Sequence, residues 1–239
     1  MPYYYGIDWT YIVIVIPCLL LSMIASASVN STFKRYSKQL SSRQLSGFDA
    51  AQRVLYNSGV TNVRIERTSG KLSDHYDPRA NVIRLSDEVY NSTSTAAIGV
   101  ACHEAGHAVQ YAQSYFPIKI RAAIIPLTNF GSKIAMPLIL LGVVLASFGS
   151  FSNTLVQLGI ACFSLSLVFQ LITLPVEFNA SRRAMEAIRS AQILTEEEQR
   201  GARKTLTAAA MTYVAAVAVS AAQLLRLILL FGGGRRRND

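Results

Sequence analysis

Apolar residues gather in four long runs, each close to the roughly 20 residues that a helix needs to cross a bilayer. The runs cover residues 11–29, 134–151, 155–174 and 206–231. Only Ser152, Asn153 and Thr154 separate the second run from the third, so these two runs are predicted to form a helical hairpin. The fourth run contains Arg226, which a membrane helix tolerates when the side chain faces protein or reaches the interface. The pattern predicts four membrane-spanning helices.

The polar stretch between the first two runs has the mixed pattern of a small α+β domain. Apolar positions at helical spacing predict a helix over 48–56, with Gly59 as its stop. Looser alternation predicts strands over 60–66 and 81–85. Because the residues between these strands are rich in turn formers, we expect a short antiparallel sheet.

Two further helices are predicted from the residues that can cap them. Ser94 or Thr95 can cap a helix that runs to about Ala112. Nearly every face of that helix is apolar, so we expect it to be buried. Thr195 can cap another helix that begins at Glu196.

The composition is that of a membrane protein. Hydrophobic residues make up 51% of the 239 residues and charged residues only 15%. Ordinary soluble domains carry about 25% charged residues, so a soluble fold is excluded. The first run is not preceded by Lys or Arg, which favours a retained anchor over a signal peptide. Three cysteines, two of them in apolar runs, give no even set for a disulfide framework.

The net charge of +9 comes from basic residues beside the apolar runs. Residues 34–133 contain 13 Lys and Arg and residues 175–204 contain 6, whereas residues 1–33 contain none. The positive-inside rule therefore predicts cytoplasmic polar segments and an external N-terminus. Three arginines at 235–237 oppose this bias, so either the earlier helices override them or the fourth run does not fully cross. Basic residues spread over two juxtamembrane segments argue against nucleic-acid binding.

The predicted buried helix carries His103, Glu104 and His107. Residues at i and i+4 share one helix face, so both imidazoles can reach one Zn²⁺ at about 2.0–2.1 Å. Glu104 lies a step around the helix, where its carboxylate can act as the general base toward a water molecule. The alternative is an accidental match with two histidines satisfied inside a helix. A metal is favoured because buried histidines on an apolar helix need partners.

A catalytic zinc site needs a third protein ligand, and Glu177 is expected to supply it. This residue lies three positions past the third apolar run, on the side of the membrane to which the hairpin returns the chain. Ser181, four residues further on, can hydrogen-bond a ligand from the same helix face. The alternative for Glu177 is a charge near a helix N-terminus, where the helix dipole stabilises it.

Several stretches resemble the bacterial YugP-type neutral zinc metallopeptidases, which are membrane proteins of the gluzincin kind. The stretches are 72–78, 83–86, 101–110, 174–178 with 180–181, and 212–215. The resemblance implies zinc ligands at His103, His107 and Glu177 and a catalytic Glu104. More distantly, the chain is similar to the HtpX and Ste24 membrane proteases, which have Asp at the place of Ser181. The YugP pattern usually has Asp at the place of Asn179, so a carboxylate is absent at both positions. Ser181 and Asn179 are the residues expected to support the ligands here.

The remaining candidates are His75 and Tyr76. In related zinc proteases a strand beside the cleft pairs with the extended substrate backbone. By that analogy, His75 or Tyr76 could stabilise the oxyanion of the tetrahedral intermediate, or the two residues could simply satisfy a turn. Cys102 precedes a ligand but points about 100° away from it on the helix, so we expect a small buried residue rather than a ligand.

Three arginines follow Glu177 on its predicted helix, at positions 182, 183 and 189. They are expected to form a solvated face that contacts anionic lipid. The alternative is that one of them binds substrate or an oxyanion.

The expected fold class is a mainly α membrane protein. It consists of four transmembrane helices and a small α+β zincin-like cytoplasmic domain, with a short sheet and a buried zinc helix over 95–112. The predicted organisation is an anchor helix in 1–33, the cytoplasmic domain in 34–133, a transmembrane hairpin in 134–174, a cytoplasmic helical segment in 175–204, and a final helix with a basic tail in 205–239.

The expected function is that of a membrane-embedded zinc endopeptidase, multi-pass in the cell membrane, with its active site on the cytoplasmic side. One Zn²⁺ per chain is the expected cofactor, and polypeptides, including membrane proteins, are the expected substrates beside the lipid bilayer. Two alternatives stay open: a zinc-binding membrane protein with weak or non-peptidase hydrolase activity, and a membrane scaffold without catalysis. Nothing in the sequence specifies a cleavage preference or an oligomeric state.

Overall fold

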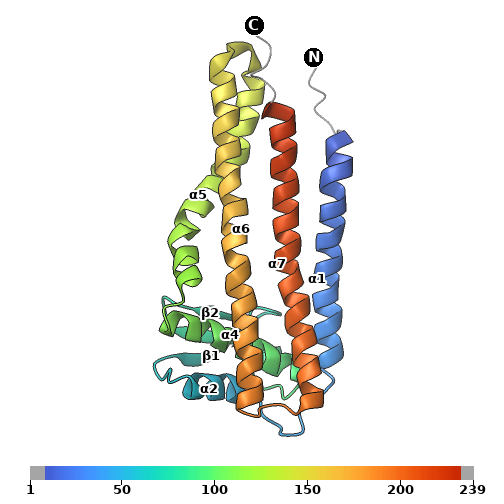
Figure 1. The fold of residues 1–239 in the computed structure, drawn as a ribbon, viewed down its shortest axis with the longest axis vertical. Helices are drawn as coiled ribbons and strands as arrows, with labels where there is room; N and C mark the ends of the chain where they lie inside the picture. Colours follow the sequence, from blue (N-terminus) through green and yellow to red (C-terminus); the bar gives the residue numbers. More distant parts are fainter. Residues whose placement is uncertain (1–8, 233–239) are drawn as a thin grey trace. The chain divides into compact units, whose positions relative to one another are not determined.

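The computed structural model describes residues 9–232 and is mainly helical, with one small sheet (Figure 1). The first eight residues and the arginines at 235–237, which bear on the topology prediction, lie outside the described residues. The described chain divides into two compact units. The helical unit contains residues 9–24, 120–173 and 213–232, and the mixed unit contains residues 25–119 and 174–212.

Four helices of the described chain are long and apolar enough to cross a membrane, as the hydrophobic runs predict. The first continues a π-helical turn, Tyr11–Val15, into α1, Ile16–Tyr36; the others are α5, Phe116–Val144, α6, Ser150–Ser190, and α7, Glu196–Phe231. Within the helical unit, the Arg226 guanidinium carbon lies 5.2 Å from the centre of the Tyr11 ring. The charge inside the fourth run therefore faces protein.

The turn of the hairpin lies earlier than the sequence predicts. Helix α5 ends at Val144, a 3₁₀ turn covers Ala146–Phe148, and α6 begins at Ser150. Gly149 has a φ of 60°, which a glycine adopts without steric cost, and this breaks the helix. The predicted turn at 152–154 is therefore wrong. Ser152 is helical because its hydroxyl donates to the Gly142 carbonyl oxygen at 2.6 Å, so its polar group is satisfied there.

The sheet of the mixed unit has three strands in the order β1-β3-β2. They are β1, Arg64–Thr68, β2, His75–Asp77, and β3, Val82–Ser86. Strands β1 and β3 are parallel, so the predicted antiparallel pairing of these two segments is wrong. The stretch expected to be a turn holds β2, which pairs antiparallel with the far edge of β3. The chain passes through β2 in the opposite direction before it enters β3, so β3 runs in the same direction as β1.

Three helices pack on and beside this sheet: α2, Gly47–Asn57, α3, Asp87–Tyr90, and α4, Thr95–Ala112. Side-chain caps fix two of the starts. The Ser46 hydroxyl accepts from the Asp49 N–H in a capping box, and the Ser94 hydroxyl accepts from the Ala97 N–H. Gly59 ends the α2 region with a φ of 69°, as the sequence predicts.

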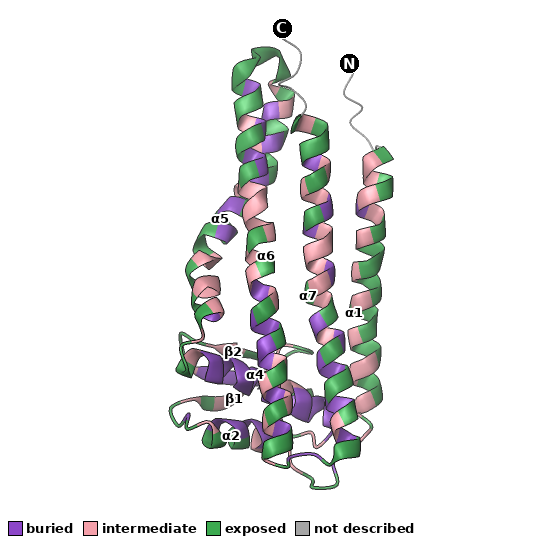
Figure 2. Cartoon of the chain, in the orientation of Figure 1, coloured by how far each residue is buried: buried purple, intermediate pink, exposed green. Residues whose placement is uncertain are grey.

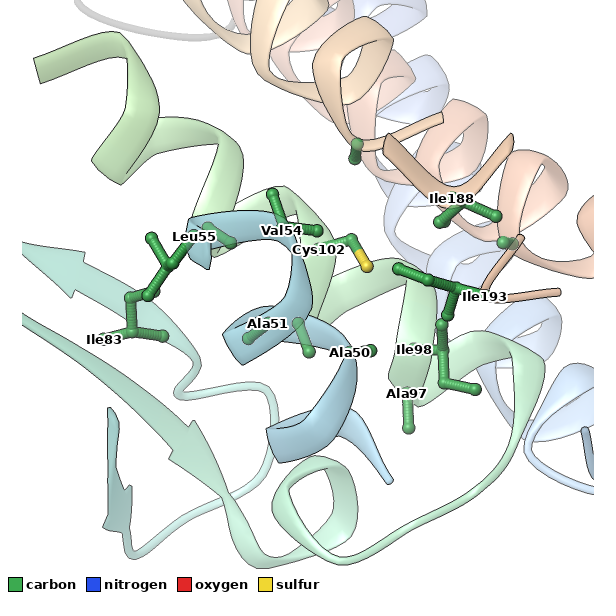
Figure 3. Packing of buried hydrophobic residues seen from close by; sticks show 14 of the residues in the cluster. Ala50, Ala51, Val54, Leu55, Ile83, Ala97, Ile98, Cys102, Ile188 and Ile193 are labelled. Carbon is green, nitrogen blue, oxygen red and sulfur yellow. The ribbon is translucent and has the colours of Figure 1, made fainter. Parts of the chain in front are cut away.

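Helix α4 is the buried centre of the mixed unit (Figure 2). Its apolar residues meet α2, β3 and the ends of α6 and α7 in one core (Figure 3), which includes Ala50, Val54, Leu55, Ile83, Ile98, Cys102, Ile188 and Ile193. Burial on nearly every face explains why α4 can hold polar side chains in a dry setting, provided that each has a partner.

Candidate metal centre

Two histidines of α4 and one glutamate of α6 form a compact cluster. His103 and His107 are four residues apart, and their ring centres lie 4.7 Å from each other in an edge-to-face arrangement. The Glu177 carboxylate oxygen Oε2 lies 3.3 Å from His103 Nε2 and 3.5 Å from His107 Nε2. The structure thus brings together the three residues that the sequence predicts as metal ligands, with one possible ligand atom from each within 4.8 Å of the others.

Helix α6 reaches the cluster because Gly106 has no side chain. A Cβ added at this position would lie 2.9 Å from the Ala180 carbonyl oxygen, which is a backbone atom of α6. Ala180 is fully buried, so it has no free space into which to retreat. A larger residue at 106 would move the backbone that carries Glu177 and Ser181.

Two of the three ligand separations in the cluster fit a tetrahedral metal ion. Two ligand atoms that each lie about 2.05 Å from a tetrahedral Zn²⁺ are about 3.3 Å apart. The separations of 3.3 and 3.5 Å from Glu177 Oε2 to the two imidazole nitrogens match this value. Glu177 is only 3% exposed, and a buried carboxylate is costly without a positive partner. The donor set of two imidazoles and one carboxylate is one that catalytic zinc uses.

The local electrostatic potential also favours a cation. Burial lowers the pKa of His107, but the hydrogen bond to Glu177 and the charges of Glu104 and Glu177 raise it by more. The net pKa is therefore above the usual value for histidine. Since the same field acts on any positive charge between these side chains, it stabilises a bound metal cation as well as a proton.

Glu104 lies beside the cluster and is held by the sheet. Its Oε2 atom accepts the Tyr76 backbone N–H of β2 at 3.0 Å, on the edge of β2 opposite β3. Asp74 lies near this carboxylate and accepts the backbone N–H and the hydroxyl of Ser86 at 2.7 and 3.0 Å. Burial raises the pKa of Asp74, and the charge of Glu104 raises it further, against the hydrogen bonds from Ser86.

The side chains of His75 and Tyr76 are not part of the cluster. His75 is exposed, and its Nδ1 lies 2.8 Å from the Ser73 carbonyl oxygen. The Tyr76 hydroxyl donates to Asn81 Oδ1 at 2.7 Å, while its ring packs against Tyr111. Tyr76 contacts Glu104 through its main-chain N–H, which donates to the carboxylate.

Both predicted supporting residues lie near the histidines. Ser181 Oγ is 3.2 Å from His103 Nδ1. Asn179 is linked to His107 through Gln110: its Oδ1 accepts from Gln110 Nε2 at 2.9 Å, and Gln110 Oε1 lies 2.9 Å from His107 Nδ1. Sequence reasoning missed Gln110, although its place three residues after His107 on a buried helix face is a signal for such a contact.

The structure also bears on the expectations for Cys102 and for the arginines that follow Glu177. Cys102 is fully buried in the apolar core (Figure 3), where burial raises its pKa, and it is not part of the metal cluster. Arg183 does not lie on a purely solvated face, because its Nε donates to Asn179 Oδ1 at 2.7 Å and its terminal nitrogen donates to Gln113 Oε1 at 2.6 Å. Arg182 is exposed and pairs loosely with Glu186 at 3.9 Å.

Four helices that are long and apolar enough to cross a membrane, together with a His-His-Glu cluster that could hold a metal ion, indicate a multi-pass membrane protein with a candidate metal site. The family described as "Putative neutral zinc metallopeptidase" matches residues 11–232, and the chain belongs to this family. It is 45% identical over 202 residues to the Bacillus subtilis (strain 168) protein named "Putative membrane protease YugP". The matched residues make up 84% of this chain and 88% of that protein. No solved structure matches the chain. These findings confirm the family that the sequence motifs indicate.

Proposed function

We propose that the chain is a membrane-embedded zinc endopeptidase. One zinc ion per chain is held by His103, His107 and Glu177, with Glu104 as the general base. The observation that carries the proposal is the pair of 3.3 and 3.5 Å separations among the three ligand residues, since these match the edges of a tetrahedral zinc site. Family membership and the relative named as a membrane protease support the peptidase assignment.

Zn²⁺ at this position supplies Lewis acidity, which polarises a peptide carbonyl and makes a water molecule easier to deprotonate. The proton transfers are carried out by a residue of the chain itself. Glu104 takes the proton of the attacking water and passes it to the leaving amine. The Tyr76 N–H donates to Oε2 of this carboxylate at 3.0 Å and so orients the general base.

The outer edge of β2 supports a place for the substrate. Strand β2 is an edge strand, and its outer edge faces Glu104. An extended polypeptide can add to such an edge through main-chain hydrogen bonds, which places a peptide bond near the general base whatever its side chains. Polypeptides, including segments of membrane proteins, are the proposed substrates.

The proposed site of action is the cytoplasmic face of the cell membrane. The excess of Lys and Arg in 34–133 and 175–204 supports this orientation. A cysteine introduced at the exposed Glu88 would test it, with the native cysteines replaced by alanine. It should react with an impermeant maleimide in inside-out vesicles and stay unlabelled in right-side-out vesicles. The reverse pattern would place the site outside.

Zinc content and proteolysis test the activity on the full chain in detergent. Inductively coupled plasma mass spectrometry should find about one zinc in wild type and in Glu104→Gln, and much less in Glu177→Ala. Casein cleavage should fall by about 10²–10⁴ in Glu104→Gln, which keeps the metal but lacks the base. Undiminished cleavage by Glu104→Gln would refute the general-base role. Zinc-loaded wild type that cleaves no peptide would point to another hydrolase activity, and wild type without zinc would refute the metal site.

A further inference from the structure

The side chain of Gln110 is fully buried between the helix of the two histidines and the helix of Glu177. Its amide makes three contacts of 2.9 Å: Oε1 with His107 Nδ1, and Nε2 with the Val176 carbonyl oxygen and with Asn179 Oδ1. A buried amide that is satisfied on both ends is held in one orientation, since turning it over would break all three contacts.

Chemistry assigns every atom of this chain of contacts, starting at Arg183. A guanidinium can only donate, so the Asn179 atom 2.7 Å from Arg183 Nε must be the amide oxygen. That oxygen accepts from Gln110, so the Gln110 atom facing it is the nitrogen, in agreement with the Val176 carbonyl, which also needs a donor. The Gln110 oxygen therefore faces His107.

An oxygen acceptor 2.9 Å from His107 Nδ1 requires a proton on that nitrogen. In a neutral imidazole the other nitrogen, Nε2, then carries the free lone pair, and it is Nε2 that lies 3.5 Å from the Glu177 carboxylate. His103 has no comparable constraint at its Nδ1, because its partner there is the Ser181 hydroxyl, which can donate or accept.

We propose that Gln110 is the positioning residue that fixes the tautomer and ring orientation of His107, and that Asn179 and Arg183 hold Gln110 in place. The inference rests on metal binding by the His-His-Glu cluster, which is part of the proposed function. Arg183 also donates to Gln113, at the C-terminal end of α4, so the network ties the helix of the histidines to the helix of Glu177.

Zinc affinity in matched variants tests the role of Gln110. Competition with a chromophoric chelator, on the full chain in detergent, should show about 10–100-fold weaker binding for Gln110→Leu, the usual cost of losing a partner of a ligand histidine. Gln52→Leu is the matched control, because Gln52 is an exposed glutamine of α2, outside the network of Gln110, Asn179 and Arg183. It should bind zinc like wild type. Wild-type affinity in Gln110→Leu would overturn the proposal.

Variants at Asn179 separate a specific contact from general damage to the packing. Asn179→Asp keeps an oxygen that accepts from Gln110 and Arg183, so its zinc affinity should stay near that of wild type. Asn179→Leu removes the acceptor and should weaken binding in the same direction as Gln110→Leu. Equal affinities in these two Asn179 variants would contradict the anchoring role of this residue.

A measurement on the unmutated protein keeps the inference testable even if a variant fails to fold. The chain has only three histidines, so a long-range proton–nitrogen NMR spectrum of ¹⁵N-histidine-labelled protein with zinc resolves each ring. His107 should carry its proton on Nδ1 and its metal on Nε2. A metal on Nδ1 would overturn the proposal. Wild type that binds no zinc would refute the metal site itself, whereas zinc binding that does not depend on Gln110 would refute only this inference.

Discussion

Helix α4 is crossed closely by two other helices, α6 and α7. At both crossings a glycine of α4 allows the close approach, but the residues around the two crossings differ. At Gly106 an added Cβ would lie 2.9 Å from the Ala180 oxygen of α6. At Gly99 it would lie 3.2 Å from the Cα and Cβ atoms of Ala202 in α7. Seven residues are about two helical turns, so both glycines lie on one face of α4. Each crossing is a glycine against an alanine.

The surroundings of the crossings differ. The Gly106 crossing is flanked by polar side chains, since the metal cluster and the Gln110 network lie on either side of it. The Gly99 crossing lies beside the apolar core, which includes Ile98 and Leu206, and beside the Thr95 hydroxyl, which donates to Gln39 Oε1 at 3.2 Å and not to a candidate metal ligand. Close packing thus positions the helix of the candidate ligand Glu177 at the first crossing, whereas the second crossing brings the start of α7 against α4.

Replacing Gly106 by alanine should have the largest effect. The new Cβ meets a backbone oxygen, which cannot move unless α6 moves, so Glu177 and Ser181 shift away from the histidines. We expect zinc affinity to fall at least about 10–100-fold, as when support of a ligand is lost. Overpacking should also lower the free energy of unfolding by about 1–3 kcal/mol, before the gain of about 1 kcal/mol in helix propensity that alanine brings. Chelator competition and chemical denaturation measure the two effects.

Gly99→Ala is the matched control for this comparison. Its Cβ is only a few tenths of an ångström too close to Ala202, and alanine gains about 1 kcal/mol over glycine in helix propensity. The free energy of unfolding should fall by about 2 kcal/mol or less, because overpacking outweighs that gain. Zinc affinity should equal that of wild type. Similar losses of zinc in both alanine variants would mean that the two crossings do not differ in function.

Replacing Ser181, the polar residue that follows Ala180, should have a smaller effect on zinc affinity. Ser181→Ala removes the hydroxyl 3.2 Å from His103 Nδ1 and leaves the crossing itself intact. Zinc affinity should fall about tenfold, the low end for such a partner, because no buried network holds this contact. Ser190→Ala, an exposed serine of the same helix, should bind zinc like wild type. A loss as large as that of Gly106→Ala would locate the effect of the crossing in this one hydroxyl.

Features with local patterns could be predicted from the sequence. The four candidate spans follow from long apolar runs, and the cap at Ser94 and the stop at Gly59 follow from single residues. The pairing of His103 with His107 follows from helical spacing. Glu177 could be chosen because few carboxylates lie close behind the third apolar run.

Features that depend on distant partners could not be predicted. Strand β2 is short and polar, and it exists because it pairs with β3. The role of Gln110 depends on α6, which is 66 residues away at Val176. The need for a glycine at position 106 could not be predicted, because it arises from the Ala180 backbone, which packs against this position only in the folded chain. The hairpin turn was misplaced because polar Ser152 looked like a turn residue while its hydroxyl is satisfied inside a helix.

The smallest expected effect concerns the side of α4 that faces the sheet, where Glu104 accepts from β2. Arg84 donates to Asp77 at 2.8 Å between β3 and β2. This hydrogen bond, with those from the Ala80 and Arg79 N–H groups, lowers the pKa of Asp77 to about 2. A carboxyl whose pKa is lowered on folding adds stability above its ordinary pKa of 3.8, and this stability is lost as the pH falls toward 2.

Asp77→Asn should therefore unfold at a slightly lower temperature than wild type at pH 7, and the gap should close by pH 2. Both proteins are measured with chelator present, so that zinc does not contribute to the difference. Zinc affinity at pH 7 should be unchanged, because β2 donates to Glu104, which binds no metal in the proposed site, whereas casein cleavage should fall, because β2 positions Glu104 through the Tyr76 N–H. A gap that is equal at both pH values would show that the Asp77 charge does not hold the strand. A loss of zinc would show that the sheet and the crossing at Gly106 are coupled.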